Sequence, residues 1–472
     1  MARDAETHAT DVAVVGAGPG GYVAAIRGAQ LGLDVTLVEG EAFGGTCLNY
    51  GCIPSKALIH ATDVAYEADN ATAMGVYADP EVDFGEMVDW KEGVVDTLTG
   101  AVEKLCKANR VNLVEGWASF EDEHTLSVDL NDGDTERYEF EHAIVATGSR
   151  PIEVPGFAFD GEHILSSREA LALEDLPDSM LVVGAGYIGM ELSTVFAKLG
   201  VDVTVIEMLD EMLPGYDREL TRPVEKNADE YGIDFEFGQA ASDWEATDAG
   251  VRLETETKDG ETFEYEAETV VVAVGREPVT DSANLEALGV EIDENGFVET
   301  DDQCRTDTDH VFAIGDVAGE PLLAHAGSAE GEVAAAVIAG EDASMADRPI
   351  PAAVFTDPEI AMVGLTESEA ADAGHETMVG EFPFRSSGRA LSTGHDEGFV
   401  RIVADEGDGT VLGAQIVGPK ASELIAELTL AVETGATVET VAETIHTHPT
   451  LAESTMEAAE NALGHAIHAL NR

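Results

Sequence analysis

The sequence predicts an α/β protein that contains two parallel-sheet units of one design, followed by a C-terminal α+β domain. Two observations support this prediction. An apolar strand, a glycine turn, a helix and a second strand occur in that order twice in the 472 residues, and this pattern does not recur after residue 351. The length is enough for about three domains of roughly 150 residues each. A hydrophobic content of 44% and 48 glycines are typical of a globular chain.

The first unit begins with DVAVVGAGPGG at residues 11–21, an apolar strand that runs into a glycine turn. Helical sequence follows, and then a second strand that ends in Glu39. Gly16, Gly18 and Gly21 permit a tight turn and the close approach of a pyrophosphate, which the N-terminus of the helix attracts. Glu39 can accept hydrogen bonds from ribose hydroxyls. This pattern predicts a dinucleotide-binding (Rossmann-like) unit.

The second unit repeats the first at a constant offset. LVVGAGYIG at residues 181–189 carries Gly184, Gly186 and Gly189, and the strand after the next helix ends in Glu207. The first glycines of the two units and the two acids are both 168 residues apart (184 − 16 and 207 − 39). One glycine fingerprint is weak evidence, whereas two complete units in register are strong evidence for two dinucleotide sites.

Apolar strands that end in glycine close the two units, at Gly148 and at Gly275. The first unit holds about 41 more residues than the second (148 − 16 against 275 − 184). A later apolar stretch, HVFAIGDVAG at residues 310–319, predicts a further strand that leads to Asp316. Ligands of open α/β sheets bind at the carboxyl ends of strands, although a plain strand and turn is the alternative here.

Two dinucleotide sites imply two dinucleotides, and FAD with NAD is the chemically sensible pair. A flavin can accept electrons from thiols on one side and exchange hydride with a nicotinamide on the other. Glu207 favours NAD over NADP, because a carboxylate hydrogen-bonds a 2′-hydroxyl and repels a 2′-phosphate. The residues that follow it, MLDEML, include no arginine that could bind the phosphate.

Two of the four cysteines, Cys47 and Cys52, lie in GGTCLNYGCIPSK at residues 44–56. An ideal helix holds Cα atoms five residues apart at roughly 8.7 Å, whereas a disulfide requires about 4.4 to 6.8 Å. A bridge therefore requires the backbone to leave regular helix. Gly51 lowers the conformational free energy that this distortion costs. Three interpretations fit the pair: a structural disulfide, half of a metal site, or a redox couple.

The charge balance is extreme, since 24 Lys and Arg against 94 Asp and Glu give a net charge of −70. Such a charge excludes nucleic acid and anionic membranes as partners. At about 1 M salt the Debye length falls to about 3 Å, so self-repulsion is screened. The composition resembles that of proteins from extreme halophiles; a generic acidic surface explains the sign of the charge but not its size.

No run of 18 apolar residues predicts a membrane span, and MARDAETHATD at the start has no apolar core of a signal peptide. Four cysteines are too few for a secreted disulfide framework. We therefore expect a cytoplasmic protein, in which a local cysteine pair is most often catalytic or metal-binding.

The cysteine segment, the two fingerprints, GD at 315–316 and HTHPTLAE at 446–453 occur together in this order. This set resembles the pyridine nucleotide-disulfide oxidoreductases over essentially the full chain, and GGTCLNYGCIPSKAL is similar to members that oxidise dihydrolipoamide. The resemblance implies a redox-active Cys47–Cys52 disulfide against the flavin, with Cys47 exchanging with substrate sulfur and Cys52 facing the flavin. A metal site lacks further ligands at suitable spacing, so no metal is predicted.

Other site residues follow from the same resemblance. Lys56 lies near the flavin ring and stabilises reduced flavin and a neighbouring thiolate. Glu191 pairs with this lysine; a first-turn partner of the helix dipole is the alternative. Asp316 binds the ribityl side of the flavin.

The resemblance also makes His448 the base for thiol deprotonation and Glu453 the acid that orients it. A competing interpretation is a capping box in which Glu453 reaches back to the Thr450 backbone, and both can hold because a carboxylate has two oxygens. His446 and His448 form an HxH pair, but no further cluster of ligands supports a metal site there.

The resemblance further implies four segments: an FAD-binding domain with the redox disulfide at 1–150, an NAD-binding domain at 151–279, a central segment completing the FAD domain at 280–350, and an interface domain at 351–472. The expected assembly is a homodimer in which the base reaches the partner's site.

The expected substrate is a lipoyl-bearing protein or free dihydrolipoamide, within a 2-oxoacid dehydrogenase or glycine-cleavage complex. Two alternatives stay open, another NAD-linked disulfide reductase and a flavoprotein whose main role is assembly or redox sensing.

Overall fold

The computed structural model describes residues 6–131 and 133–471, which form two compact units. The first unit takes in the chain up to Val154 together with Ser166–Asp175 and Val274–Asp347. The second takes in Pro155–Leu165, Leu176–Ala273 and the chain from Arg348 onward. The short segment Ser166–Asp175 therefore belongs to the first unit, whereas the predicted boundaries place it in the NAD-binding domain at 151–279.

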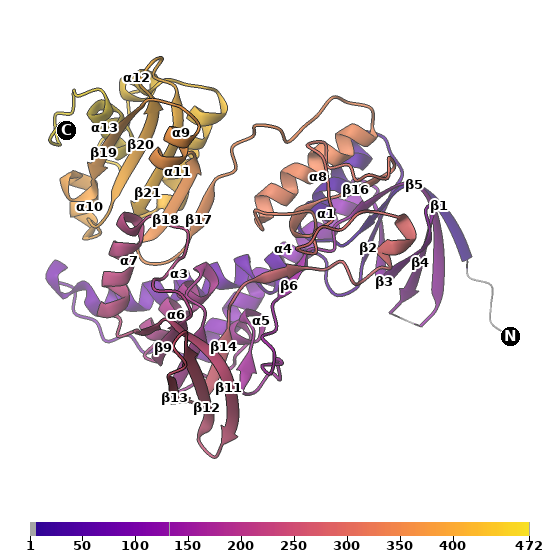
Figure 1. Ribbon diagram of the computed structural model, residues 1–472, viewed down its shortest axis with the longest axis horizontal. Coiled ribbons are helices and arrows are strands. Elements are labelled where there is room, and N and C mark those ends of the chain that lie inside the picture. Colours follow the sequence, from indigo (N-terminus) through magenta and orange to yellow (C-terminus); the bar gives the residue numbers. More distant parts are fainter. Residues whose placement is uncertain (1–5, 132, 472) are drawn as a thin grey trace. The chain divides into compact units, whose positions relative to one another are not determined.

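The first unit contains a mixed sheet in which β1 pairs in parallel with both β2 and β5, and β16 extends the sheet beyond β5 (Figure 1). Val12 and Val14 face one side of this sheet and Ala13 and Val15 the other, and all four are buried, as expected for a strand covered on both faces. Its strands are β1 (Glu6–Val15), β2 (Val35–Glu39), β3 (Asn112–Asp122), β4 (Thr125–Leu130), β5 (Thr135–Val145) and β16 (Val311–Ala313).

Helices α1 (Pro19–Gln30) and α8 (Ala324–Ile338) lie side by side on one face of this sheet (Figure 1). Glycines bring them close together: a Cβ at Gly331 would lie 2.5 Å from the carbonyl oxygen of Gly20. The additional segment of the first unit forms α2 (Gly45–Asn49), α3 (Cys52–Asn70) and α4 (Phe84–Ala108). The antiparallel pair β6 (Ser149–Pro151) and β15 (Arg276–Pro278) completes the unit together with α5 (Ser167–Leu171).

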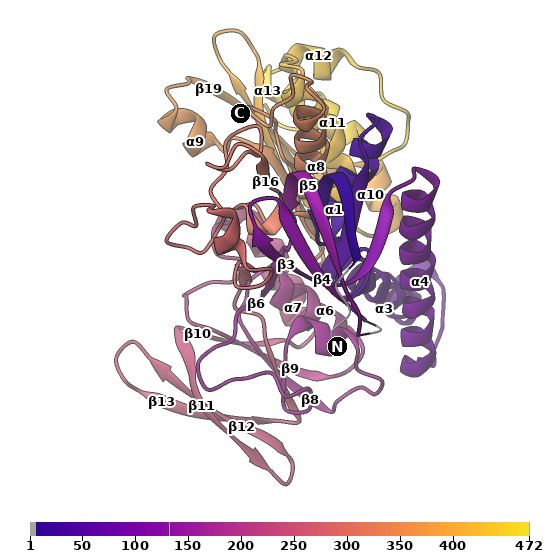
Figure 2. The same cartoon turned by 90° about the vertical axis from the view of Figure 1, so that its right-hand side faces the viewer.

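The second unit begins with a parallel sheet of order β10-β9-β8-β14-β7. Its elements are β7 (Ile164–Leu165), β8 (Ser179–Val183), α6 (Tyr187–Lys198), β9 (Asp202–Glu207), α7 (Arg218–Glu230), β10 (Asp234–Phe237) and β14 (Thr269–Val272). A three-stranded antiparallel sheet follows, with strands β11 (Gln239–Thr247), β12 (Gly250–Thr257) and β13 (Thr262–Ala267), which lie side by side in Figure 2.

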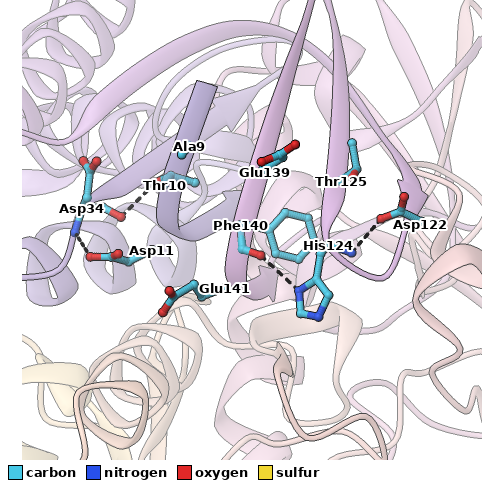
Figure 3. Close-up of a pocket in the computed structure, with 10 residues that line it drawn as sticks. All are labelled: Ala9, Thr10, Asp11, Asp34, Asp122, His124, Thr125, Glu139, Phe140 and Glu141. Atoms are coloured by element: carbon cyan, nitrogen blue, oxygen red, sulfur yellow. Dashed lines mark hydrogen bonds between the residues drawn. The ribbon is translucent and has the colours of Figure 1, made fainter. Parts of the chain in front are cut away.

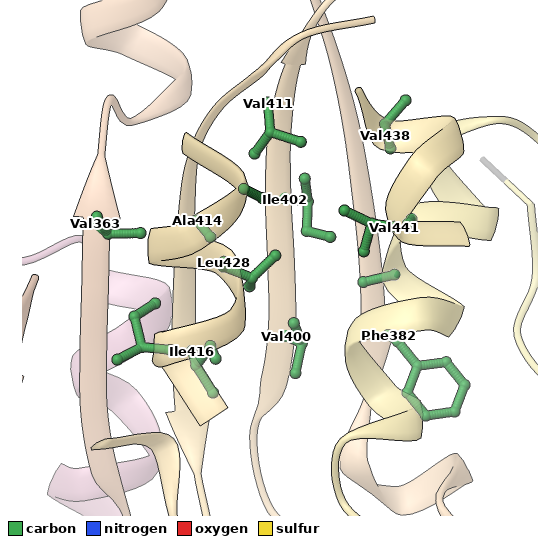
Figure 4. Close-up of a cluster of buried hydrophobic side chains, with 14 of the residues drawn as sticks. Val363, Phe382, Val400, Ile402, Val411, Ala414, Ile416, Leu428, Val438 and Val441 are labelled. Carbon is green, nitrogen blue, oxygen red and sulfur yellow. The ribbon is translucent and has the colours of Figure 1, made fainter. Parts of the chain in front are cut away.

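The C-terminal part is the predicted α+β fold, a five-stranded antiparallel sheet of order β17-β18-β21-β20-β19. Helices cover it, and Ile402, Ile416 and Leu428 are fully buried in its core (Figure 4). Burial of each such side chain stabilises the fold by about 1.5–3 kcal/mol. The elements are β17 (Ala352–Val354), β18 (Glu359–Gly364), α9 (Glu367–Asp372), β19 (Thr377–Pro383), α10 (Gly388–Thr393), β20 (Phe399–Asp405), β21 (Val411–Gly418), α11 (Ala421–Glu433), α12 (Val438–Glu443) and α13 (Glu453–Ala462).

The main differences from the sequence prediction lie at strand ends. β1 begins five residues before the apolar run, because Glu6–Thr10 pair with Glu136–Phe140 of β5 through backbone hydrogen bonds that do not depend on apolar side chains. The two closing strands stop at Val145 and Val272, each three residues before the predicted glycine. Among residues 6–131 and 133–471, no helix combines the length and apolar character needed to cross a membrane.

Candidate active site

Backbone packing explains the outer glycines of both fingerprints. Gly16 and Gly184 have φ values of +100° and +106°, in the left-handed region that favours glycine. A Cβ at Gly21 would lie 1.9 Å from the carbonyl oxygen of Gly16, and one at Gly189 would lie 2.0 Å from that of Gly184. The first glycine therefore makes the turn, and the third lets the helix pack against it.

The middle glycines, Gly18 and Gly186, have a different role. Each is the N-cap of its helix in extended backbone, and a Cβ at either position would meet nothing within 4 Å. The free space at a helix N-terminus is what a pyrophosphate requires, since the backbone N–H groups there attract anions. Both turns therefore fit a dinucleotide.

The two acids at the ends of the second strands are held in the same way. Glu39 accepts hydrogen bonds from the Ala17 N–H at 2.7 Å and the Glu41 N–H at 2.8 Å. Glu207 accepts from Ala185 at 2.7 Å and Leu209 at 2.8 Å. Burial raises the pKa of Glu39, and the backbone hydrogen bonds oppose this effect. Both carboxylates are thus oriented beside a glycine turn and keep lone pairs for ribose hydroxyls.

The backbone between the cysteines leaves the helix, as a disulfide between them would require. Cys47 lies in α2 and Cys52 begins α3, while Tyr50 (φ −134°) and Gly51 (φ −136°, ψ −106°) form a non-helical break. Both cysteines are in the thiol form, Cys47 half-buried and Cys52 exposed. A hydrogen bond with Cys52, then burial, raise the pKa of the Cys47 thiol, whereas the charge of Lys56 lowers it.

This cysteine segment packs against the first glycine turn. The Gly44 N–H donates to the carbonyl oxygen of Ala17 at 2.9 Å. At Gly45, with φ +57°, a Cβ would lie 2.6 Å from the Cα of Gly18. The thiol pair therefore lies next to the turn that is predicted to bind the flavin dinucleotide.

Asp316 belongs to the same group of residues. It lies just after β16, and it accepts a hydrogen bond from the Ser149 hydroxyl at 2.5 Å. That hydroxyl in turn accepts from Nε of Arg276 at 2.8 Å. The negative charge of Asp316 adds to the effects that raise the pKa of Cys47.

Sequence reasoning missed Ser149 and Arg276. Their only signal is that each directly follows a predicted closing glycine, Gly148 (φ +72°) or Gly275 (φ +130°), at the start of β6 and β15.

Glu191 is buried in the second turn of α6, and its carboxylate accepts from the Phe355 N–H at 2.9 Å. The first turn of this helix carries no acid. The alternative of a first-turn partner for the helix dipole is therefore wrong, because the helix begins at Tyr187, four residues before the glutamate. The pairing of Glu191 with Lys56 stays a prediction.

The orienting contact predicted for His448 is present in the second unit, where its Nδ1 lies 2.9 Å from Oε1 of Glu453. Oε2 accepts from the Thr450 N–H at 2.9 Å. The full capping box is absent, because α13 begins at Glu453 with Ala452 as its N-cap and the Thr450 hydroxyl donates to Thr447 instead. Burial raises the pKa of Glu453, but the hydrogen bonds from Thr450 and His448 outweigh it, so the pKa is lowered.

His446 has hydrogen-bond contacts on both ring nitrogens. Its Nε2 lies 3.0 Å from Oε1 of Glu427, and its Nδ1 lies 2.8 Å from the Thr444 carbonyl oxygen. Within residues 6–131 and 133–471, no group of three or more His, Cys, Asp and Glu residues could hold a metal ion.

An acidic pocket of 630 Å³ lies elsewhere in the first unit (Figure 3). Carboxylates and His124 line it, and Asp11 accepts there from the Asp34 N–H at 2.8 Å. It contains none of the predicted site residues, so we place the candidate site at the first glycine turn and the thiol pair instead.

Comparison with known proteins identifies the family of the chain. Residues 10–331 match the pyridine nucleotide-disulphide oxidoreductases, and residues 350–459 match the dimerisation domain of these proteins. The chain is 66% identical to a dihydrolipoyl dehydrogenase of Halobacterium salinarum and 60% identical to one of Haloferax volcanii, and each alignment covers 98% of both sequences. A crystal structure of LpdA from Mycobacterium tuberculosis has a TM-score of 0.90 at 29% identity and covers 96% of this chain and 99% of that one. The chain therefore belongs to the family of pyridine nucleotide-disulphide oxidoreductases.

Proposed function

We propose that this chain is a dihydrolipoyl dehydrogenase, which oxidises dihydrolipoyl groups to the cyclic disulfide with NAD⁺ and carries FAD. One observation supports this most directly: Cys47 and Cys52 flank a helix break that packs against the first glycine turn. A dithiol pair in this position suits exchange with a second dithiol, and relatives 60–66% identical over nearly their full length carry the name of this activity.

The first fingerprint would hold FAD, through the N-terminus of α1, Glu39 and Asp316. The second would hold NAD, through the N-terminus of α6 and Glu207. Lys56 would lie near the flavin, where its positive charge favours thiolate and reduced cofactor. When bound, the flavin accepts an electron pair from the thiols and passes it as hydride to NAD⁺.

The protein's own residues carry the thiol chemistry. Nε2 of His448 takes the proton of one dihydrolipoyl thiol, and the resulting thiolate attacks Cys47 of the oxidised pair. A mixed disulfide between substrate and Cys47 forms, and Cys52 leaves as a thiolate. The second substrate thiol then attacks the substrate sulfur of this mixed disulfide and releases Cys47. The substrate departs as a cyclic disulfide, and its two electrons remain in the reduced Cys47–Cys52 pair.

The match of residues 350–459 to a dimerisation domain supports a homodimer, in which His448 of one subunit would serve the thiol pair of the partner. The electron donor would be a lipoyl group on a carrier protein of a 2-oxoacid dehydrogenase or glycine-cleavage complex. A reducing cytoplasm suits an enzyme whose working groups alternate between dithiol and disulfide.

The test is NAD⁺ reduction by dihydrolipoamide in molar KCl, with NADP⁺ and reduced glutathione assayed beside it. We expect turnover with dihydrolipoamide and NAD⁺ and rates at least tenfold lower in either substituted assay. Bound flavin without dihydrolipoamide turnover, or preferred use of glutathione, would contradict the proposal. A Cys47→Ser variant that kept full turnover would contradict the thiol chemistry.

A further inference from the structure

The segment Ser166–Asp175 is a part of the first unit that sequence reasoning did not connect with the site. Its helix α5 begins with a capping box between Ser166 and Glu169. The ammonium of Lys91, which is 1% exposed on α4, donates to the carbonyl oxygen of Leu171 at 2.6 Å. The same ammonium also pairs with Oε1 of Glu92 at 2.7 Å. Its hydrogen bond to Leu171 therefore ties α5 to α4 within the first unit.

Arg168 on α5 contacts two parts of the candidate site. Its guanidinium carbon lies 3.7 Å from the centre of the Tyr50 ring, and its Nη1 donates to Oε2 of Glu41 at 3.1 Å. Tyr50 belongs to the break between the cysteines, and Glu41 donates its backbone N–H to Glu39. One arginine thus links the loop after β2 to the thiol segment.

Tyr50 is the residue of this break whose side chain can be held by a contact with another segment of the chain. Of the four residues between the cysteines, Leu48 and Asn49 belong to α2, and Gly51 has no side chain. The geometry of the break decides where the two sulfur atoms lie relative to each other. A contact that immobilises the Tyr50 ring therefore limits the positions available to both thiols.

The stacking contact is suited to high salt. At about 1 M salt the Debye length is about 3 Å, which weakens the partly exposed ion pair of Arg168 with Glu41. A guanidinium stacked on a ring also makes close van der Waals contact, which salt does not screen. Loss of the Tyr50 ring should therefore cost more than loss of the Glu41 charge.

We propose that Arg168 is a positioning residue for the Cys47–Cys52 pair: it holds Tyr50, and through it the helix break that sets the reactivity of the two thiols. The inference rests on the proposed function for the role of the pair. Arg168 itself does not touch the reacting atoms in this scheme.

The test uses the full-length, flavin-loaded enzyme in molar KCl. The variants are Arg168→Met, Arg168→Lys, Tyr50→Leu, Glu41→Gln and the double variant Arg168→Met/Tyr50→Leu. Arg252→Met is the matched control, since Arg252 is a similarly exposed arginine that contacts Glu245 and Glu266 on the three-stranded sheet. The readouts are kcat and KM for dihydrolipoamide and NAD⁺, flavin content, and the rate at which iodoacetamide alkylates the NADH-reduced enzyme across pH.

We expect Arg168→Met and Tyr50→Leu each to lower kcat about tenfold, because small displacements of reacting groups are costly. Each should also change the alkylation profile, while KM for NAD⁺ and flavin content stay within about twofold of the unmodified protein. Arg168→Lys should retain more of the original kcat than Arg168→Met does. Glu41→Gln should lower kcat less than Tyr50→Leu does. The double variant should lose no more than the worse single variant, because both changes remove one contact.

The proposal is overturned if Arg168→Met behaves as Arg252→Met does, or if the two losses multiply in the double variant. Failure of the proposed function has a different signature, since the unmodified enzyme would then not oxidise dihydrolipoamide. The alkylation profile reports on the thiols without any substrate, so it tests the role of Arg168 in that case as well.

Discussion

The imidazole of His448 and the carboxylate of Glu453 lie 2.9 Å apart, from Nδ1 to Oε1, while the second carboxylate oxygen accepts from the Thr450 backbone. A carboxylate can only accept, so Nδ1 carries the proton and Nε2 is left free to take one from a thiol. The Thr450 hydrogen bond fixes the carboxylate and thereby the orientation of the ring.

Replacement of either member of this pair should slow the enzyme. We expect His448→Gln to lower kcat with dihydrolipoamide by about 10²–10⁴, the usual contribution of a general base. Glu453→Gln should cost less, because the ring remains but its tautomer is no longer enforced. Glu443→Gln, at the exposed end of α12, is the control. An equal loss of kcat in this control would contradict a catalytic role for His448 and Glu453.

The lowered pKa of Glu453 also predicts how stability depends on pH. A carboxyl group whose pKa is lower in the folded state stabilises the fold above its unfolded pKa of about 4.3, and this contribution disappears as pH falls through the lower, folded pKa. The Tm difference between the unmodified protein and Glu453→Gln should be constant above about pH 5 and should shrink as pH falls further. A difference that grows toward acid pH would contradict this assignment.

Lys56 should control when the thiol pair ionises. Its charge lowers the pKa of Cys47, against the larger effects of the Cys52 hydrogen bond and burial. Lys56→Met should therefore move iodoacetamide alkylation of the NADH-reduced enzyme to higher pH. Lys104→Met on α4 serves as the control for loss of one surface charge. An equal shift of the alkylation profile in both variants would mean that Lys56 acts only through the overall charge of the protein.

The second glycine fingerprint offers a matched pair of substitutions. Gly186→Ala adds a methyl group to open space and should leave Tm unchanged while it raises KM for NAD⁺. Gly189→Ala places a methyl group 2.0 Å from the Gly184 carbonyl oxygen, so it should destabilise the protein by about 1–3 kcal/mol or more. Thermal unfolding and NAD⁺ titration would check both, and unfolding of the Gly186 variant would argue against free space at that turn.

Glu207 should decide between the two pyridine nucleotides. Glu207→Gln removes the charge that repels a 2′-phosphate and weakens hydrogen bonding to the ribose, which for a charged group is worth about 1.5–3 kcal/mol. The ratio of kcat/KM for NADP⁺ to that for NAD⁺ should rise about tenfold or more. An unchanged ratio would show that other residues choose the nucleotide.

Salt should activate the enzyme. With a net charge of −70, self-repulsion opposes folding until ions screen it. We expect kcat and Tm to rise with KCl into the molar range. Dilution into low-salt buffer should inactivate the protein. Full activity and stability in dilute buffer would refute this expectation.

Much of this architecture is predictable because it repeats along the chain. The fixed offset of 168 residues identifies both glycine turns and both acids. The spacing of the two cysteines shows that a bridge between them would need a break in the helix, and the structure has one at Tyr50 and Gly51. Contacts between distant segments leave no such local pattern. Arg168 stacks on Tyr50 across 118 positions, and nothing in the sequence around either residue indicates the partner.

The same limit explains the wrong alternative for Glu191. Glu191 follows a fingerprint and looks like a residue of the first helical turn, but the helix begins at Tyr187, and the carboxylate partner is Phe355, far along the chain. For Glu453 the two predicted contacts are both present, one oxygen to His448 and the other to the Thr450 backbone. Only the reciprocal contact of a capping box is missing, because the helix begins at Glu453 itself.

The approach of Gly45 to Gly18 has a consequence for protein engineering. A single added methyl group at Gly45 would overlap the first glycine turn at Gly18, so the loop that carries the thiols and this turn are packed tightly against each other. Neither can be transplanted into another scaffold as an independent cassette. A graft of the thiol loop must bring its glycine turn with it, and diversity introduced by directed evolution in one loop is constrained by the shape of the other.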